Sequence, residues 1–247
     1  MDWTSWRRHF EANAGRPVPF VEAPPLRPEV AKAVAWSLAR FQLGESGEGR
    51  IAHEIDRVAL PGIDGDYRQA LKRFVREEGR HGAILALMVR ALGGRLLSRT
   101  WTERLFVFGR RLLGIRFKLL VLLAAEVIGI GFYGLIAAGL PAGAMRSALE
   151  QICSDEEHHL RFHVDFFRAG EAGLFWRSAW WVLGTAAAAV VLWDHRRTLS
   201  ALGVPSGAAA AKLWALVQRT AAGLGPTGSE YDRIELALPS KSAGAAR

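Results

Sequence analysis

Cysteine is almost missing from the 247-residue chain, which holds only Cys153. One thiol cannot form an internal disulfide, and it cannot complete a Cys-x-x-Cys metal or redox motif. A disulfide-stabilised fold is therefore excluded, and a reducing compartment suits the chain. We expect a cytoplasmic protein.

Alternation of polar and apolar residues, the pattern of a half-buried strand, is nowhere sustained over more than a few positions. Proline is also scarce, with 10 residues, whereas half of all residues are hydrophobic. Apolar residues recur instead at helical spacings, as Leu71, Phe74 and Val75 do. The pattern predicts an all-α protein, and the length suits one large domain.

Two further classes of protein lack their sequence signals here. Residues 1–10 contain no apolar stretch of a secretory signal peptide, so we expect the mature protein to keep the whole chain. The formal net charge is +8, but the basic residues are scattered and match no nucleic-acid-binding motif. Nucleic acid is not an expected partner, and an anionic membrane surface suits the charge better.

Helix start and stop signals divide most of the chain into segments. Pro28 suits a first helical turn, and Pro61 and Gly62 would stop that helix. Thr100 and Glu103 form a capping box that opens a short basic and aromatic helix, expected to be a crossover. The expected helices cover residues 28–60, 64–94, 100–114, 115–139, 142–169 and 206–222, with a Trp-rich segment at 173–202.

These segments predict a domain organisation around one bundle. The expected parts are an N-terminal extension at 1–27, a four-helix bundle with a long crossover at 28–170, additional Trp-rich helices packed on it at 171–222 and a mobile tail at 223–247.

The motif Glu-x-x-His occurs once in each half of this bundle. Glu78 and His81 are three positions apart in one expected helix, and Glu156 and His159 repeat the spacing in another. Residues three apart project from the same helical face. One such pair would carry little weight, but the chain contains it twice.

A lone glutamate precedes each motif at a similar distance. Glu45 lies 33 positions before Glu78, and Glu126 lies 30 positions before Glu156. About 30 residues let a helix rising roughly 1.5 Å per residue turn and return to the same height. Each glutamate can therefore face its own motif. Glu48 is an alternative to Glu45, because it lies 30 positions before Glu78.

Four carboxylates and two imidazoles at one level of a bundle suit two iron or manganese ions with positions left for dioxygen. Glu126 makes the case sharpest, because it is the one charge in the apolar stretch 119–140 and a buried carboxylate needs a partner. The expected ligands are Glu45, Glu78, His81, Glu126, Glu156 and His159.

Several neighbours of the motif could support such a site. Glu77 and Asp155 each precede a Glu-x-x-His, where a carboxylate could accept the second ring N–H of the ligating histidine from the opposite half. Tyr133 and Cys153 are candidates for the lining of a pocket, although we prefer to interpret Cys153 as a small core residue. Two more histidines, His158 and His163, could be extra ligands or proton relays, or lie on the surface.

Four stretches resemble the ferritin-like di-iron carboxylate superfamily over residues 29–170: Gly44-Glu45-Ser46-Gly47, Glu77-Glu78-Gly79-Arg80-His81, Ala125-Glu126-Val127-Ile128 and Asp155-Glu156-Glu157-His158-His159. Rubrerythrin and demethoxyubiquinone hydroxylase have a similar Gly-Glu opening. Aldehyde-deformylating oxygenase looks similar around the last two helices of the bundle, where a glutamate is followed seven residues later by a tyrosine, as Glu126 is by Tyr133. No stretch matches one subfamily.

The resemblance implies a ferritin-like bundle with two iron ions, or manganese and iron, which react with dioxygen. An oxidoreductase would act on an apolar small molecule and need an external electron donor. Iron storage or detoxification without an organic substrate is the alternative, and a bundle that has lost its metal is a third. The substrate, the donor and the oligomeric state are not specified.

Membrane contact is raised by two apolar stretches. Residues 119–140 are long enough to span a membrane, but Glu126 as a metal ligand requires this segment to lie inside the bundle. The uncharged segment 178–193 has 16 residues and is too short to span. We therefore expect no membrane span. Peripheral contact at the inner membrane surface remains an expectation, through residues 101–118 or the cluster Trp176, Trp180 and Trp181.

Overall fold

The computed structural model describes residues 1–45, 51–98, 114–170 and 173–225. Every regular element within these ranges is helical, which confirms the all-α prediction. The helices are α1 (Trp3–Asn13), α2 (Pro28–Glu45), α3 (Ile51–Glu54), the 3₁₀ turn η2 (Ile55–Arg57), α4 (Gly65–Ala91), α6 (Gly114–Gly139), α7 (Ala144–Ala169), α8 (Leu174–Asp194), α9 (Arg196–Ala201) and α10 (Ser206–Gly223).

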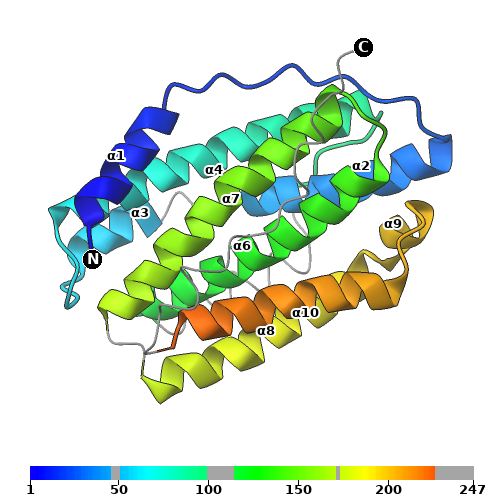
Figure 1. Ribbon diagram of the computed structural model, residues 1–247. Coiled ribbons are helices and arrows are strands. Elements are labelled where there is room, and N and C mark those ends of the chain that lie inside the picture. Colours follow the sequence, from blue (N-terminus) through cyan, green and yellow to red (C-terminus); the bar gives the residue numbers. More distant parts are fainter. Residues whose placement is uncertain (46–50, 99–113, 171–172, 226–247) are drawn as a thin grey trace, which may run out of the picture.

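Four long helices form a bundle of two packed pairs (Figure 1). In one pair α2 lies against α4, and in the other α6 lies against α7. The pairs meet where α4 contacts α7. Figure 1 shows the two helices of each pair running in opposite directions, so residues about 30 positions apart return to one height.

The ends of α4 follow from local chemistry. The Asp64 carboxylate accepts a hydrogen bond from the backbone N–H of Tyr67 and caps the first turn. At the other end, Gly93 adopts a φ of 72°, a conformation that glycine reaches without steric cost. The prediction for residues 64–94 is therefore close to the observed helix.

The expected helix over residues 28–60 is predicted a few residues too long at its end. The described residues are helical over α2 and again over α3 and η2, and the chain turns extended at Val58, ahead of Pro61 and Gly62. Residues 46–50, which include Glu48, lie outside the described residues.

Helix α1 was not predicted, since residues 1–27 were expected to be an extension without a defined element. The Asp2 side chain caps it by accepting a hydrogen bond from the backbone N–H of Ser5. It packs on α4, and the Trp6 indole N–H donates to Asp165 of α7 over 2.9 Å. The expected helix at 100–114 and the tail from residue 226 lie outside the described residues, apart from Gly114.

The C-terminal helices cover the outer side of the second pair. Helices α8 and α10 pack on each other and on α6, whereas α9 packs on α2. Figure 1 shows α8 and α10 on the side of the molecule opposite α1. Among the described helices, α6 and α8 are long and apolar enough to cross a membrane, yet their most apolar windows are 89% and 17% buried respectively.

Candidate metal centre

The two Glu-x-x-His motifs meet inside the bundle. Glu78 and His81 project from α4, and Glu156 and His159 project from α7, at the place where these helices contact each other. One ligand atom from each of the four residues lies within 4.8 Å of the other three. All four side chains are buried, so the structure supports a possible metal site of the carboxylate and histidine type.

Each imidazole points one nitrogen at the glutamate of the opposite helix. His81 Nδ1 lies 3.0 Å from Glu156 Oε1, and His159 Nδ1 lies 2.6 Å from Glu78 Oε1. Both histidines therefore present the same ring atom to the cluster. The two contacts are equivalent, because in each of them a histidine of one helix faces the motif glutamate of the other helix.

The outer nitrogen of each imidazole contacts a second carboxylate, also from the opposite helix. His81 Nε2 lies 3.2 Å from Asp155 Oδ2, and His159 Nε2 lies 3.3 Å from Glu77 Oε2. Although burial opposes the charged ring, the carboxylates around each imidazole raise the pKa of His81 to about 9 and the pKa of His159 well above its usual value. A carboxylate at Nε2 holds the proton there, so Nδ1 is the nitrogen that would give up its proton to a cation. Glu77 and Asp155 thus contact the outer ring nitrogens from the opposite helix, as expected, and their support of a bound ion stays a prediction.

Two arginines hold Asp155 in turn. Arg16 Nη1 lies 2.7 Å from Asp155 Oδ1, and Arg80 pairs with Oδ2 of the same carboxylate. Burial alone would raise the pKa of Asp155, but the His81 hydrogen bond and the charges of His81, Arg80 and Arg16 lower the pKa below its usual value. The carboxylate is thereby kept ionised beside His81.

Glu126 joins the cluster from α6. Its Oε2 lies 3.8 Å from His159 Nδ1, and its side chain is hydrogen-bonded to Glu156. Burial, followed by the charges of Glu156 and Glu78, raises the pKa of Glu126 well above its usual value. Burial removes this carboxylate from the solvent that would stabilise its charge, and a cation beside it would relieve that cost.

Glu45 reaches the cluster from the end of α2. Its carboxylate is hydrogen-bonded to Glu78, and it accepts a hydrogen bond of 2.6 Å from the Tyr133 hydroxyl. Burial and the charges of Glu78 and Glu156 raise the pKa of Glu45 well above its usual value. The structure thus brings all six expected ligands to one region, while the alternative ligand Glu48 lies outside the described residues.

Several atoms of this region lack the hydrogen bonds that burial demands. Within the described part of the chain, Glu78 Oε1, Glu156 Oε2 and His159 Nδ1 are buried without a hydrogen-bond partner, despite their short separations. An unsatisfied buried polar group costs about 1–3 kcal/mol. Close approach without directed hydrogen bonds suits atoms that share a cation, so the donor set fits a metal site of the carboxylate and histidine type.

His163 is a further donor beside the six, and sequence reasoning ranked it below them. It lies one helical turn beyond His159 and is fully buried, with Nε2 3.6 Å from Glu126 Oε1. Burial and the charge of His159 lower the pKa of His163 to about 3, so the ring is neutral. Neither ring nitrogen has a hydrogen-bond partner among the described residues. The sequence signal for this contact is the spacing of four residues from His159, which places both histidines on the same face of α7.

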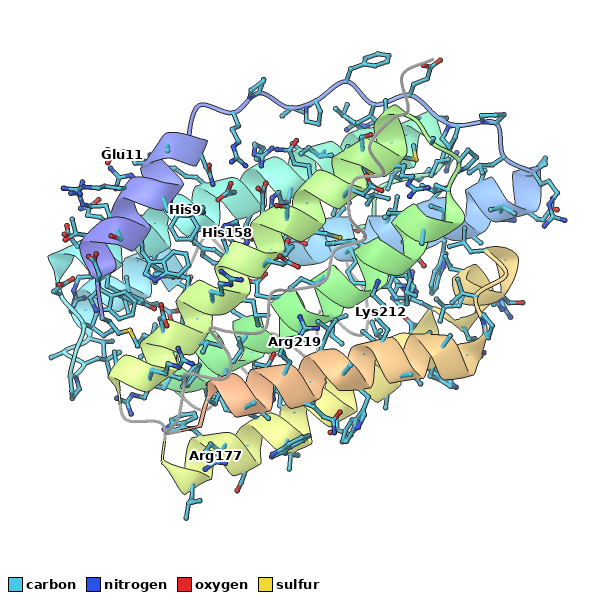
Figure 2. The ribbon with its side chains drawn as sticks, in the orientation of Figure 1. His9, Glu11, His158, Arg177, Lys212 and Arg219 are labelled. Carbon is cyan, nitrogen blue, oxygen red and sulfur yellow. The ribbon has the colours of Figure 1, made fainter. Side chains whose placement is uncertain are left out.

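His158, the other histidine weighed from sequence, faces away from the cluster. Its Nδ1 lies 2.9 Å from the backbone oxygen of Ser154, and its ring stacks on His9 of α1 with 4.4 Å between centroids. Figure 2 shows His9 and His158 facing each other between α1 and α7. The structure therefore gives His158 a place in the packing of α1.

Cys153 lies one turn before Glu156 and points into the core. Its thiol is 3.8 Å from the backbone oxygen of Ile130, and burial, followed by the charge of Glu156, raises the pKa of Cys153 to about 12. The thiol stays protonated and behaves as a small core residue. Tyr133, the other pocket candidate, is fully buried and directs its hydroxyl to Glu45.

Phe10 of α1 covers the side of the cluster nearest His159, and it was not identified from sequence. Its ring centroid lies 5.8 Å from that of His159 and 5.2 Å from that of Phe162, and its side chain is 1% exposed. The N-terminal helix therefore helps to exclude water from the centre.

Comparison with protein-family models, with curated proteins and with solved structures finds no match to this chain.

Proposed function

We propose that this chain binds two iron ions, or one manganese and one iron ion, and uses them to activate dioxygen for the oxidation of an apolar small molecule. The observation that carries the proposal is the buried group Glu78, His81, Glu156 and His159, whose ligand atoms lie within 4.8 Å of one another. The resemblance to ferritin-like di-iron proteins gives the reaction class.

The ligands would come from all four helices of the bundle. Glu45 and Glu126 would add one carboxylate each to the two Glu-x-x-His motifs, completing a set of hard oxygen and borderline nitrogen donors. When bound, the ions would supply the electrons and the open positions that dioxygen needs, and an external donor would restore the electrons.

The chain itself would provide orientation and a dry environment. Glu77 and Asp155 would keep the histidine protons on Nε2, so that Nδ1 stays available as a ligand atom. Phe10 and Phe74 pack against the His159 ring and would keep water away from it. An apolar substrate suits a centre with such neighbours better than a polar one does.

The first test counts metal. Protein purified from cells supplied with iron and manganese should contain about two ions per chain. Glu156→Gln should remove most of them, because the amide loses the negative charge that holds a cation. Glu157→Gln is the matched control, because Glu157 lies on the same helix α7 as Glu156 but outside the cluster. Less than one ion per chain in the unchanged protein would refute the metal centre.

A second measurement separates oxidation from storage. The loaded protein is reduced and exposed to dioxygen with excess ferrous iron, and bound iron is counted again. A count that stays near two, with oxidation of an added lipid-like substrate, supports the proposal. Accumulation of far more iron per chain would identify a storage protein instead.

A further inference from the structure

Helix α8 carries an apolar face that the described part of the protein leaves uncovered. Leu174, Phe175 and Val182 are 79%, 72% and 73% exposed, and Trp193 at the other end is 60% exposed. Trp181 lies between them at 38%, beside the exposed Trp214 of α10 with 5.6 Å between ring centroids. These positions recur at helical spacing, so they form one stripe along the whole helix.

The opposite side of α8 fixes the helix on the bundle. Trp180, Gly184 and Ala188 are buried at intervals of four residues. The Trp180 indole N–H donates to the backbone oxygen of Val217 in α10 over 3.0 Å. A side chain at Gly184 would come within 3.3 Å of Val217, so the two helices approach closely. Figure 1 shows α8 lying lengthwise along the bundle beside α10. Because Trp180, Gly184 and Ala188 face the protein, the apolar stripe on the other side of the helix faces outward.

Charges stand at the two ends of this stripe and leave its middle uncharged. Arg177 and Asp194 are the only charged residues of α8, and Asp194 is paired with Arg40, 3.1 Å away. Figure 2 places Arg177 near the start of the helix, far from the labelled residues of α1. Exposed Arg196 and Arg197 follow the other end, where the Arg196 guanidinium lies 4.8 Å from the Trp193 ring centroid.

This charge distribution favours an anionic membrane over a second copy of the chain as the partner of the stripe. If two copies paired antiparallel along α8, Arg177 of one would meet Arg196 and Arg197 of the other. If they paired parallel, each basic end would meet itself. Both arrangements oppose like charges in a chain whose net charge is already +8. An anionic bilayer, in contrast, offers acyl chains to the stripe and negative headgroups to both ends.

We infer that α8, together with Trp214 of α10, seats the protein on an anionic membrane surface. The helix lies in the plane of the bilayer, its apolar stripe enters the boundary between headgroups and acyl chains, and its tryptophans sit at the level of the headgroups. The inference does not depend on metal, because none of the residues in the stripe belongs to the metal centre.

The test measures binding of the full-length protein to vesicles, with phosphatidylcholine alone or mixed with phosphatidylglycerol. The protein should sediment with the anionic vesicles and much less with the neutral ones, and high salt should weaken binding. Val182→Asp should weaken binding about tenfold or more, because a carboxylate opposes both apolar insertion and the anionic surface. Lipids brominated along their chains should quench the tryptophan fluorescence.

The matched control is Phe20→Asp. Phe20 is 76% exposed, but it lies in the segment after α1, across the molecule from α8 in Figure 1. Equal loss of binding in both variants, or absence of binding to anionic vesicles, would overturn the inference. Self-association of the unchanged protein that Val182→Asp abolishes, without lipid binding, would assign the stripe to a second copy. The metal count, measured on the same samples, reports separately on the proposed centre.

Discussion

The Tyr133 hydroxyl donates a hydrogen bond of 2.6 Å to Glu45 Oε1 and so joins α6 to α2, helices that belong to different pairs of the bundle. The Tyr133 ring is fully buried, and Glu45 lies beside Glu78 in a crowded group of carboxylates. This bond fixes the direction of the Glu45 carboxylate beside Glu78.

Tyr133→Phe should therefore weaken the centre without dismantling it. Loss of one hydrogen bond to a charged group costs about 1.5–3 kcal/mol, so affinity for ferrous or manganous ions should fall at least tenfold. Competition with a chelator of known affinity measures this. Tyr67→Phe is the control, because the Tyr67 hydroxyl is buried without a hydrogen-bond partner among the described residues. A similar fall in both variants would contradict the role of the Tyr133 bond.

His163→Leu should separate two contributions of one side chain. Both ring nitrogens of His163 are buried without hydrogen-bond partners among the described residues, and each such group destabilises the folded state by about 1–3 kcal/mol. Because leucine removes both nitrogens, the metal-free variant should be as stable as the unchanged protein or more stable. Metal affinity should fall, because the imidazole lies 3.6 Å from Glu126. Thermal unfolding with and without metal gives both quantities. Reduced stability of the metal-free variant, with unchanged metal affinity, would make His163 a packing residue alone.

Phe10→Ala tests the contribution of α1. Truncating a buried phenylalanine typically costs about 3–5 kcal/mol, so the midpoint of urea unfolding should fall. Because the Phe10 ring contacts His159, water should also reach the centre more easily. Val18→Ala, at a 43% exposed position of the following segment, serves as the control and should leave both properties unchanged. An unaltered midpoint in Phe10→Ala would mean that α1 does not pack on the bundle in solution.

His195 predicts how stability depends on pH. Burial among Phe41 and Phe132 lowers the pKa of His195 to about 4 from an ordinary 6.5. The neutral ring is favoured in the folded state, so stability is full above pH 6.5 and decreases as the pH falls toward 4. The shift corresponds to at most about 3 kcal/mol.

His195→Asn should remove that part of the pH dependence, since the amide does not titrate and can still bond to Ser37. Ser37→Ala is the counterpart, because it deletes the 2.7 Å contact to His195 Nδ1 but keeps the titrating ring. Urea unfolding of the three proteins between pH 4 and 7 measures the slopes. If His195→Asn and the unchanged protein lost stability equally, the ring would not be buried as described.

Local signals were sufficient for most helices of the bundle. A cap such as Asp64 and a left-handed glycine such as Gly93 act within a few residues, so sequence spacing predicts the ends of α4 well. The motif spacing likewise predicted which residues would meet, because antiparallel helices convert about 30 positions into one height. The metals, the substrate and the reaction have no such local signal.

Features that depend on tertiary contacts were missed or incompletely predicted. Helix α1 is rich in tryptophan and arginine, and only its packing against Tyr67 and Phe162 shows which face is buried. Helices α6 and α8 are both long and apolar enough to cross a membrane, yet one lies inside the bundle and the other on its surface. Composition does not specify which neighbours cover a helix, so the buried position of α6 was predicted from one residue, Glu126, and the exposed face of α8 became visible only in the structure.

Each histidine of the centre is oriented by a carboxylate from the other helix pair, so assembly of the centre depends on both pairs. Glu77 of α4 holds a histidine of α7, and Asp155 of α7 holds a histidine of α4. Neither helix pair could therefore orient its own imidazole alone, and half of the chain would be a poor chelator. Metal binding at this centre should therefore report docking of the two halves, and separation of the halves by partial unfolding should release the bound metal.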